Sequence, residues 1–143
     1  MAIEVRCIEH LSSEQRQSLN LLYGPLIGKN SICLYEFLGS IQNLVELEDV
    51  YLLLNMNASQ FDIARNHLEQ YHLIETYVCE ADMLILLYAP LLPDSFLCHE
   101  TYSRLYLASV GAKCFDKVKA MLYKDKTVSS SYTKVESPLD VSI

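Results

Sequence analysis

Five lysines near the end of the chain have a residue type and spacing that favour one chemistry, the binding of phosphate groups. Lys113, Lys117 and Lys124 are four and seven residues apart and would share one face of a helix, with Lys119 and Lys126 beside them. Such a stripe binds phosphates without sequence preference. Lysines are also favourable near a helix C-terminus without any ligand. We take Lys113, Lys117, Lys119 and Lys124 as candidate nucleic-acid contacts, although the pattern favours a solvated helix face.

Catalytic patterns are missing from the sequence. It contains no glycine-rich phosphate loop, no His-Glu-x-x-His motif and no nucleophile elbow. His67 and His72 are five residues apart, which does not place two ligands on one helical face. Cys98, His99 and Glu100 are adjacent and point in different directions. We therefore predict that the protein is not an enzyme and has no catalytic residue, no cofactor and no metal site.

The charge of the chain is unevenly distributed. The net charge is −7, of which residues 1–112 contribute −9 and residues 113–126 contribute +3. The five cysteines are widely spaced, and we interpret them as reduced, mostly buried thiols of a cytoplasmic protein. No signal peptide is evident, and the longest apolar run, Met83–Leu92, is about half of what a bilayer span requires. Any association with the nucleoid or the membrane would depend on partners.

The stretch 47–92 must position any binding surface, because its order predicts a winged helix, that is, a helix-turn-helix followed by a β-hairpin wing. The predicted elements are helices 47–54 and 59–71 and strands 73–79 and 83–87. Asn57 or Ser59 would cap the second helix. This fold binds DNA or proteins, so it does not choose a function by itself.

The second helix of this unit is poorly suited to reading duplex DNA. It offers Arg65 as its cation, beside Asp62, Glu69 and Glu75, and the wing tip carries Glu80 and Asp82. Phosphate neutralisation supplies much of the affinity for DNA, so this surface should repel the duplex. We expect protein contact or packing instead.

The remaining segments surround the winged helix. Apolar and polar residues alternate over residues 1–10, which predicts a strand. We expect this strand to be an arm that pairs with the wing or with a second subunit. A helix starts at Ser12, which forms a capping box with Gln15, and we expect Gly24-Pro25 to end it. The other predicted segments are helix 29–42, a connection over 42–46, helix 99–110, a break at Gly111, and helix 113–123 with Phe115, Val118 and Leu122 inward.

The predicted fold class is therefore α+β and mainly α: a winged helix with an extra N-terminal arm and C-terminal helices. We expect residues 1–126 to form one oligomerisation domain, and residues 127–143 to be a disordered tail or the start of a linker. A positive mean hydropathy of +0.14 fits either a self-association surface or a core rich in Leu and Tyr. By position alone, we expect an oligomer interface at Ile3, Val5, Phe96, Tyr102 and Tyr106.

Two stretches resemble the motifs of a known family. Residues 21–28 read LLYGPLIG and precede Leu34-Tyr35, which is similar to a LYxPLIGxxAxxLY signature. Residues 88–96 read YAPLLPDSF and precede Tyr106 and Val110-Gly111, which is similar to an ELxPPLxPxxFF…LYxxVG block. The family is that of the DnaB/DnaD-type replication initiation and membrane attachment proteins of low-GC Gram-positive bacteria. Residues 10–125 resemble the amino-terminal domain of its DnaB member, a helicase-loading cofactor and not the helicase.

The resemblance implies a winged-helix domain used for self-association in the primosome, with a DnaD-like protein and the helicase loader as partners. In the family, DNA binding lies largely in downstream domains, so DNA contact by this domain is expected to be weak. We predict a non-enzymatic assembly domain, acting as a homo-oligomer, either a dimer or a tetramer, in DNA replication initiation. The alternative is a DNA-binding transcriptional regulator of the winged-helix type, which should carry a basic recognition helix.

Overall fold

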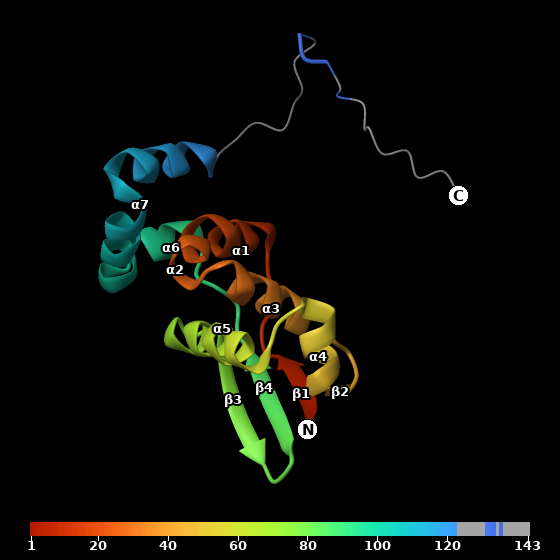
Figure 1. Cartoon of the computed structure of the whole chain (residues 1–143). Helices are drawn as coiled ribbons and strands as arrows, with labels where there is room; N and C mark the ends of the chain where they lie inside the picture. The colour runs from red at the N-terminus through yellow and green to blue at the C-terminus, as the bar shows by residue number, and fades with distance from the viewer. Residues whose placement is uncertain (123–130, 134, 136–143) are drawn as a thin grey trace.

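The computed structural model describes residues 1–122, 131–133 and 135, and in this part the chain is mainly helical with one small mixed sheet (Figure 1). The fold class predicted from the sequence is confirmed. The strands are β1 (Ala2–Cys7), β2 (Val45–Glu46), β3 (Ile74–Cys79) and β4 (Asp82–Leu87). The helices are α1 (Ser13–Gln17), η1 (Ser18–Tyr23), α2 (Gly24–Ile27), α3 (Lys29–Ser40), α4 (Leu47–Leu54), α5 (Ala58–Gln70), α6 (Pro93–Cys98) and α7 (Glu100–Met121).

The winged helix is formed by α4, α5 and the hairpin of β3 and β4, as the sequence predicted. Asn55 has a φ of 53° and ends α4 in the left-handed conformation. Asn57 caps α5, because its side chain accepts the Gln60 N–H at 2.8 Å and the Gln60 side chain accepts the Asn57 N–H at 2.9 Å. Asn57, and not Ser59, is therefore the cap, and α5 begins one residue earlier than predicted.

The N-terminal arm is an internal strand of the sheet, whose order is β2-β1-β4-β3. It runs parallel to β4, with Ala2 opposite Asp82 and Cys7 opposite Leu87, and antiparallel to β2. The arm therefore pairs with the wing of its own chain. The short strand β2 lies in the segment that was predicted to be a plain connection.

The first helical segment passes through Gly24 and Pro25, so the predicted helix end was wrong. The capping box of Ser12 and Gln15 is present. After α1 the chain widens into the π-helical segment η1, where the Gly24 N–H bonds to the Leu19 carbonyl. Pro25 then falls in the first turn of α2, where its missing N–H is tolerated. The break comes at Gly28, whose φ is 87°.

The predicted break at Gly111 is confirmed as a sharp kink inside α7 (Figure 1). Gly111 has φ 83° and ψ 162°, a conformation that other residues avoid. The kink directs Val118 and Leu122 inward, where they are buried, and brings the Phe115 ring to 5.9 Å from that of Tyr106. The lysines of this half are therefore turned outward.

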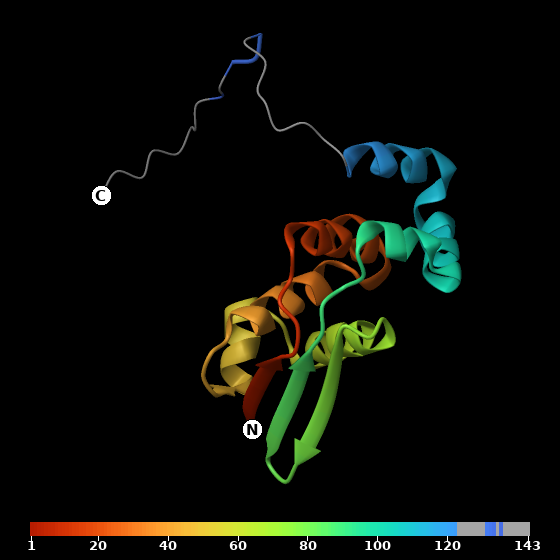
Figure 2. The ribbon, with the colours of Figure 1, turned by 180° about the vertical axis from the view of Figure 1, so that it is seen from behind.

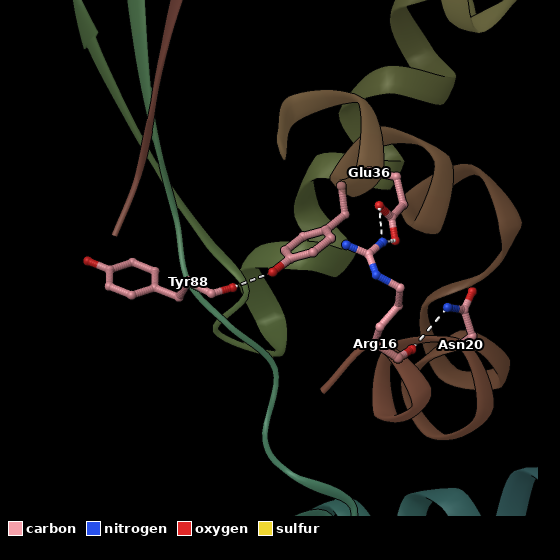
Figure 3. Close-up of polar contacts among 5 residues, drawn as sticks. Arg16, Asn20, Glu36 and Tyr88 are labelled. Atoms are coloured by element: carbon pink, nitrogen blue, oxygen red, sulfur yellow. Dashed lines mark hydrogen bonds and ion pairs between the residues drawn. The ribbon is translucent and has the colours of Figure 1, made fainter. Parts of the chain in front are cut away.

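Three tyrosines connect the helices to distant backbone through their hydroxyl groups. The Tyr35 hydroxyl donates to the Tyr88 carbonyl at 2.6 Å (Figure 3), and the Tyr106 hydroxyl donates to the Leu21 carbonyl at 2.8 Å. The Tyr23 hydroxyl accepts the Leu91 N–H at 3.0 Å. Burial raises the pKa of Tyr23 to about 12 and also raises that of Tyr35. These three side chains are buried, and each hydroxyl bonds a part-buried backbone group that belongs to another element or to the segment after β4.

Candidate interaction surfaces

The lysines of α7 lie on its exposed second half. Lys113 and Lys117 are one helical turn apart, and the Lys119 ammonium lies 4.6 Å from the centroid of the Phe115 ring. Lys124 lies outside the described residues. The structure thus places a short basic surface beyond the Gly111 kink, and the assignment of these lysines to nucleic-acid contact remains a prediction.

All four arginines of the chain are in ion pairs. Arg65 Nη1 lies 2.6 Å from Glu69 Oε2, so the positive charge of the one arginine in α5 is balanced by a carboxylate of the same helix. The other pairs are Arg6–Glu4 at 3.3 Å, Arg16–Glu36 at 2.5 Å (Figure 3) and Arg104–Glu100 at 2.8 Å. Exposed pairs of this kind contribute only about 0–1 kcal/mol to stability, but they leave no arginine unpaired for a phosphate.

The five residues expected at an oligomer interface do not form one surface. Ile3, Phe96 and Tyr106 are at most 1% exposed within a single chain. Their side chains fill its core because the arm is an internal strand and α6 and α7 pack on the first helices. Val5 and Tyr102 are half-buried, and the Tyr102 ring stacks on His99 at 3.9 Å. Three of these five side chains are therefore core residues of the single chain, and the location of a self-association surface stays a prediction.

The cysteines differ from the prediction in their burial, since all five are exposed. They are free thiols, none of which is in a disulfide. Among the residues that the structure describes, no group of three His, Cys, Asp or Glu side chains could hold a metal ion. In the same part of the chain, no helix is long and apolar enough to cross a membrane.

One surface was not predicted from the sequence, the face of the sheet that the described residues leave uncovered, which we call the outer sheet face. Register places its residues in three rows across β1, β4 and β3: Ala2, Asp82 and Cys79; Glu4, Leu84 and Tyr77; Arg6, Leu86 and Glu75. The alternate residues Ile3, Ile85 and Ile74 point to the core. Seen from behind, these strands lie in front of the helices (Figure 2). The alternation of inward and outward side chains along each strand can be predicted from the sequence, but the register between the strands cannot.

A carboxylate between two tyrosines marks one end of the outer sheet face. Glu75 accepts hydrogen bonds from the Tyr88 hydroxyl and from the Tyr77 hydroxyl, the latter at 3.0 Å. These two bonds hold the pKa of Glu75 below its usual value, so the carboxylate is charged at neutral pH. Tyr88 directly follows β4, and Figure 3 shows its ring pointing away from the helices.

Two hollows flank Tyr77, which is 51% exposed. One, of about 520 Å³, lies toward the end of α5 and is lined by Glu69, His72, Glu75, Tyr77 and Tyr88, among others. The second, of about 450 Å³, lies toward the wing tip and includes Glu4, Leu44, Tyr77, Asp82 and Leu84. Apolar and aromatic side chains thus form the middle of the outer sheet face, and carboxylates form its rim.

Together, the fold and these surfaces define a winged-helix domain with an acidic wing and a separate basic helix. The sequence matches the family described as the DnaB N-terminal winged helix domain over residues 6–140, and the chain belongs to this family. A comparison with curated protein sequences found no match.

A solved structure supports the assignment to this family. The structure of primosome protein DnaB (residues 1–300) from Geobacillus stearothermophilus is 26% identical in sequence and has a TM-score of 0.78. The match covers 95% of this chain and 56% of that chain. The chain therefore spans little more than half of the length of the chain in that structure.

The motifs that resembled the family are explained by the fold. Tyr23 and Pro25 of the first motif lie where η1 joins α2, and Tyr35 donates its hydroxyl to the backbone of the second motif. Pro25 has no N–H for the carbonyl four residues before it, that of Leu21, and the Tyr106 hydroxyl donates to that carbonyl instead. Side chains of both motifs therefore hold the helices on the wing.

Proposed function

We propose that this domain is a non-enzymatic assembly module of DNA replication initiation, which acts by self-association and by protein contacts in the primosome. The observation that carries the proposal is the match to the DnaB N-terminal winged helix domain over residues 6–140. Its partners would be further copies of the chain, a DnaD-like protein and the helicase loader. It would act in the cytoplasm and reach the nucleoid or the membrane through those partners.

The charges of the winged helix support protein contact over DNA contact. A duplex-reading helix needs free cations along its exposed face, whereas α5 carries Arg65 paired to Glu69 and its wing carries Glu80 and Asp82. An acidic wing raises the local concentration of basic protein surfaces and lowers that of DNA. Self-association would multiply weak contacts to a partner through effective concentration.

Light scattering behind a sizing column, over a concentration series of the protein, tests this proposal. We expect a dimer or a tetramer that persists at low micromolar protein. A monomer at every concentration would remove self-association from the mechanism and leave an external partner as the route to assembly.

The second candidate, a DNA-binding transcriptional regulator, is favoured by one observation, the exposed Lys113 and Lys117 on α7. A gel shift at low salt, with the wild type and with the double variant Lys113→Glu/Lys117→Glu, tests it. A shift that the double variant loses would support DNA contact by α7. If the wild type gives no shift, direct DNA binding by this domain is refuted.

A further inference from the structure

The outer sheet face is covered by no other element in the part of the chain that the structure describes. Its middle contains Leu84, Leu86 and Tyr77, and an exposed Tyr and two hollows are unusual on a face that meets only water. In both views the helices lie on the other side of the sheet or beyond its upper end (Figures 1 and 2). The face therefore has the shape and the apolar area of a contact surface.

The charges on this face restrict what can cover it. Glu4, Glu75 and Asp82 lie within its three rows, and its one arginine, Arg6, is paired with Glu4. Two copies of the face pressed together by a two-fold axis would bring carboxylates against carboxylates, which is repulsive. A symmetric pairing of this face with itself is thus disfavoured, and the occupant must be basic.

The basic surface that the described chain itself offers is the second half of α7. The arginines of the chain are all in ion pairs, whereas Lys113 and Lys117 are exposed one turn apart, and exposed Met121 follows Lys117 by a further turn. This combination of two ammonium groups and one apolar side chain complements a face that has carboxylates around leucine and tyrosine.

The two surfaces cannot meet within one molecule. Figures 1 and 2 both show the wing at one end of the domain and the half of α7 beyond the kink at the other end. Each chain therefore presents one acidic and one basic surface to its neighbours. A contact between two different surfaces is heterologous, and repetition of it yields a ring or an open chain, depending on the rotation between copies.

We propose that the outer sheet face of one chain binds the lysine-bearing second half of α7 of a second copy, in a head-to-tail contact. In this contact Lys113 and Lys117 lie among the carboxylates of the face, and Met121 packs on its apolar side chains. The inference rests on the proposed function, since it names the surfaces through which the domain self-associates.

The test uses variants that remove the charge of each surface and keep a polar side chain at each position, which limits the risk of misfolding. Glu75→Gln/Asp82→Asn removes charge from the face, and Lys113→Gln/Lys117→Gln removes it from the helix. Glu14→Gln/Glu48→Gln is the control, because both glutamates are exposed on other elements. Circular dichroism of each variant checks that it is folded. Association is measured by sedimentation equilibrium at low salt.

We expect each surface variant to weaken self-association at least about fivefold, because two exposed charge pairs are lost, while the control matches the wild type. The decisive arm mixes the two surface variants in equal amounts. One then retains an intact helix and the other an intact face, so the mixture should form a heterodimer and stop there. Raised salt should weaken the wild-type contact in the same way.

The outcomes separate this inference from the function on which it rests. If the wild type self-associates and both surface variants associate equally well, the head-to-tail contact is wrong and the proposed function stands. The head-to-tail contact is also wrong if the mixed variants assemble no further than each one alone. If the wild type is a monomer at every concentration, self-association itself fails, and a basic segment of another protein becomes the occupant to seek.

Discussion

The hydrogen bond from Tyr106 to the Leu21 carbonyl leads to a quantitative prediction about the stability of the fold. Pro25 cannot supply the N–H that an α-helix would bring to this carbonyl, and Tyr106, which is 1% exposed, donates to it at 2.8 Å. Tyr106→Phe retains the ring and removes only the hydroxyl, so the part-buried Leu21 carbonyl loses its partner. An unsatisfied buried group of this kind costs about 1–3 kcal/mol. We expect Tyr106→Phe to lower the free energy of unfolding by about 2 kcal/mol.

The assay is urea unfolding followed by circular dichroism. For a slope of about 2 kcal/mol per molar urea, the expected loss moves the midpoint down by about 1 M. Tyr132→Phe is the matched control, since Tyr132 is 76% exposed and should change the midpoint little.

A double-mutant cycle isolates the cause. Pro25→Ala restores an N–H at the position that an α-helix would use, so in that background the Leu21 carbonyl has a second potential donor. Tyr106→Phe should then cost less than it does in the wild type. Equal costs in both backgrounds, or a cost below about 0.5 kcal/mol in the wild type, would refute the idea that Tyr106 compensates for Pro25.

Three further predictions concern a kink, a cap and a titration. Gly111→Ala should lower the free energy of unfolding by about 1–3 kcal/mol because of the φ of 83°, although the new Cβ would meet no atom within 4 Å. Gly39→Ala inside α3 is the comparison and should leave the stability unchanged or raise it; urea unfolding should show a lower midpoint for the first variant and no decrease for the second. Asn57→Ala should lose about 1 kcal/mol as the cap of α5, and Ser59→Ala should lose much less; thermal unfolding of both variants would expose a mistaken cap. The pKa of Tyr23 is about 12 when folded and 10.0 as its reference value, so the stability that it contributes is present below pH 10 and is lost as pH rises toward 12; in Tyr23→Phe the urea midpoint should depend less on pH across that window.

The corrections to the sequence-based predictions have one physical origin, which is that residues distant in the chain decide them. Whether Pro25 ends a helix depends on the π-helical widening before it and on Tyr106, which comes from α7. Ile3 was expected at a subunit interface, but β1 lies between β2 and β4, so its side chain is in the core. The cysteines were expected to be buried because thiols usually are, yet here they lie on the outer sides of their elements.

The sequence by itself determined the features that depend on neighbours within one or two turns. Helical periodicity, the capping box of Ser12 and Gln15 and the break at Gly111 could be predicted from the sequence, as could a cap at Asn57 or Ser59. Each depends on residues three or four positions apart or on the backbone conformation of one residue. The distribution of charge was equally predictable from the sequence, which has an acidic body and a basic last helix. Only the tertiary structure decided that the carboxylates of three strands share one uncovered face. That arrangement requires Ala2 to pair with Asp82 and Asp82 with Cys79, and strand register is fixed by packing between segments distant in sequence.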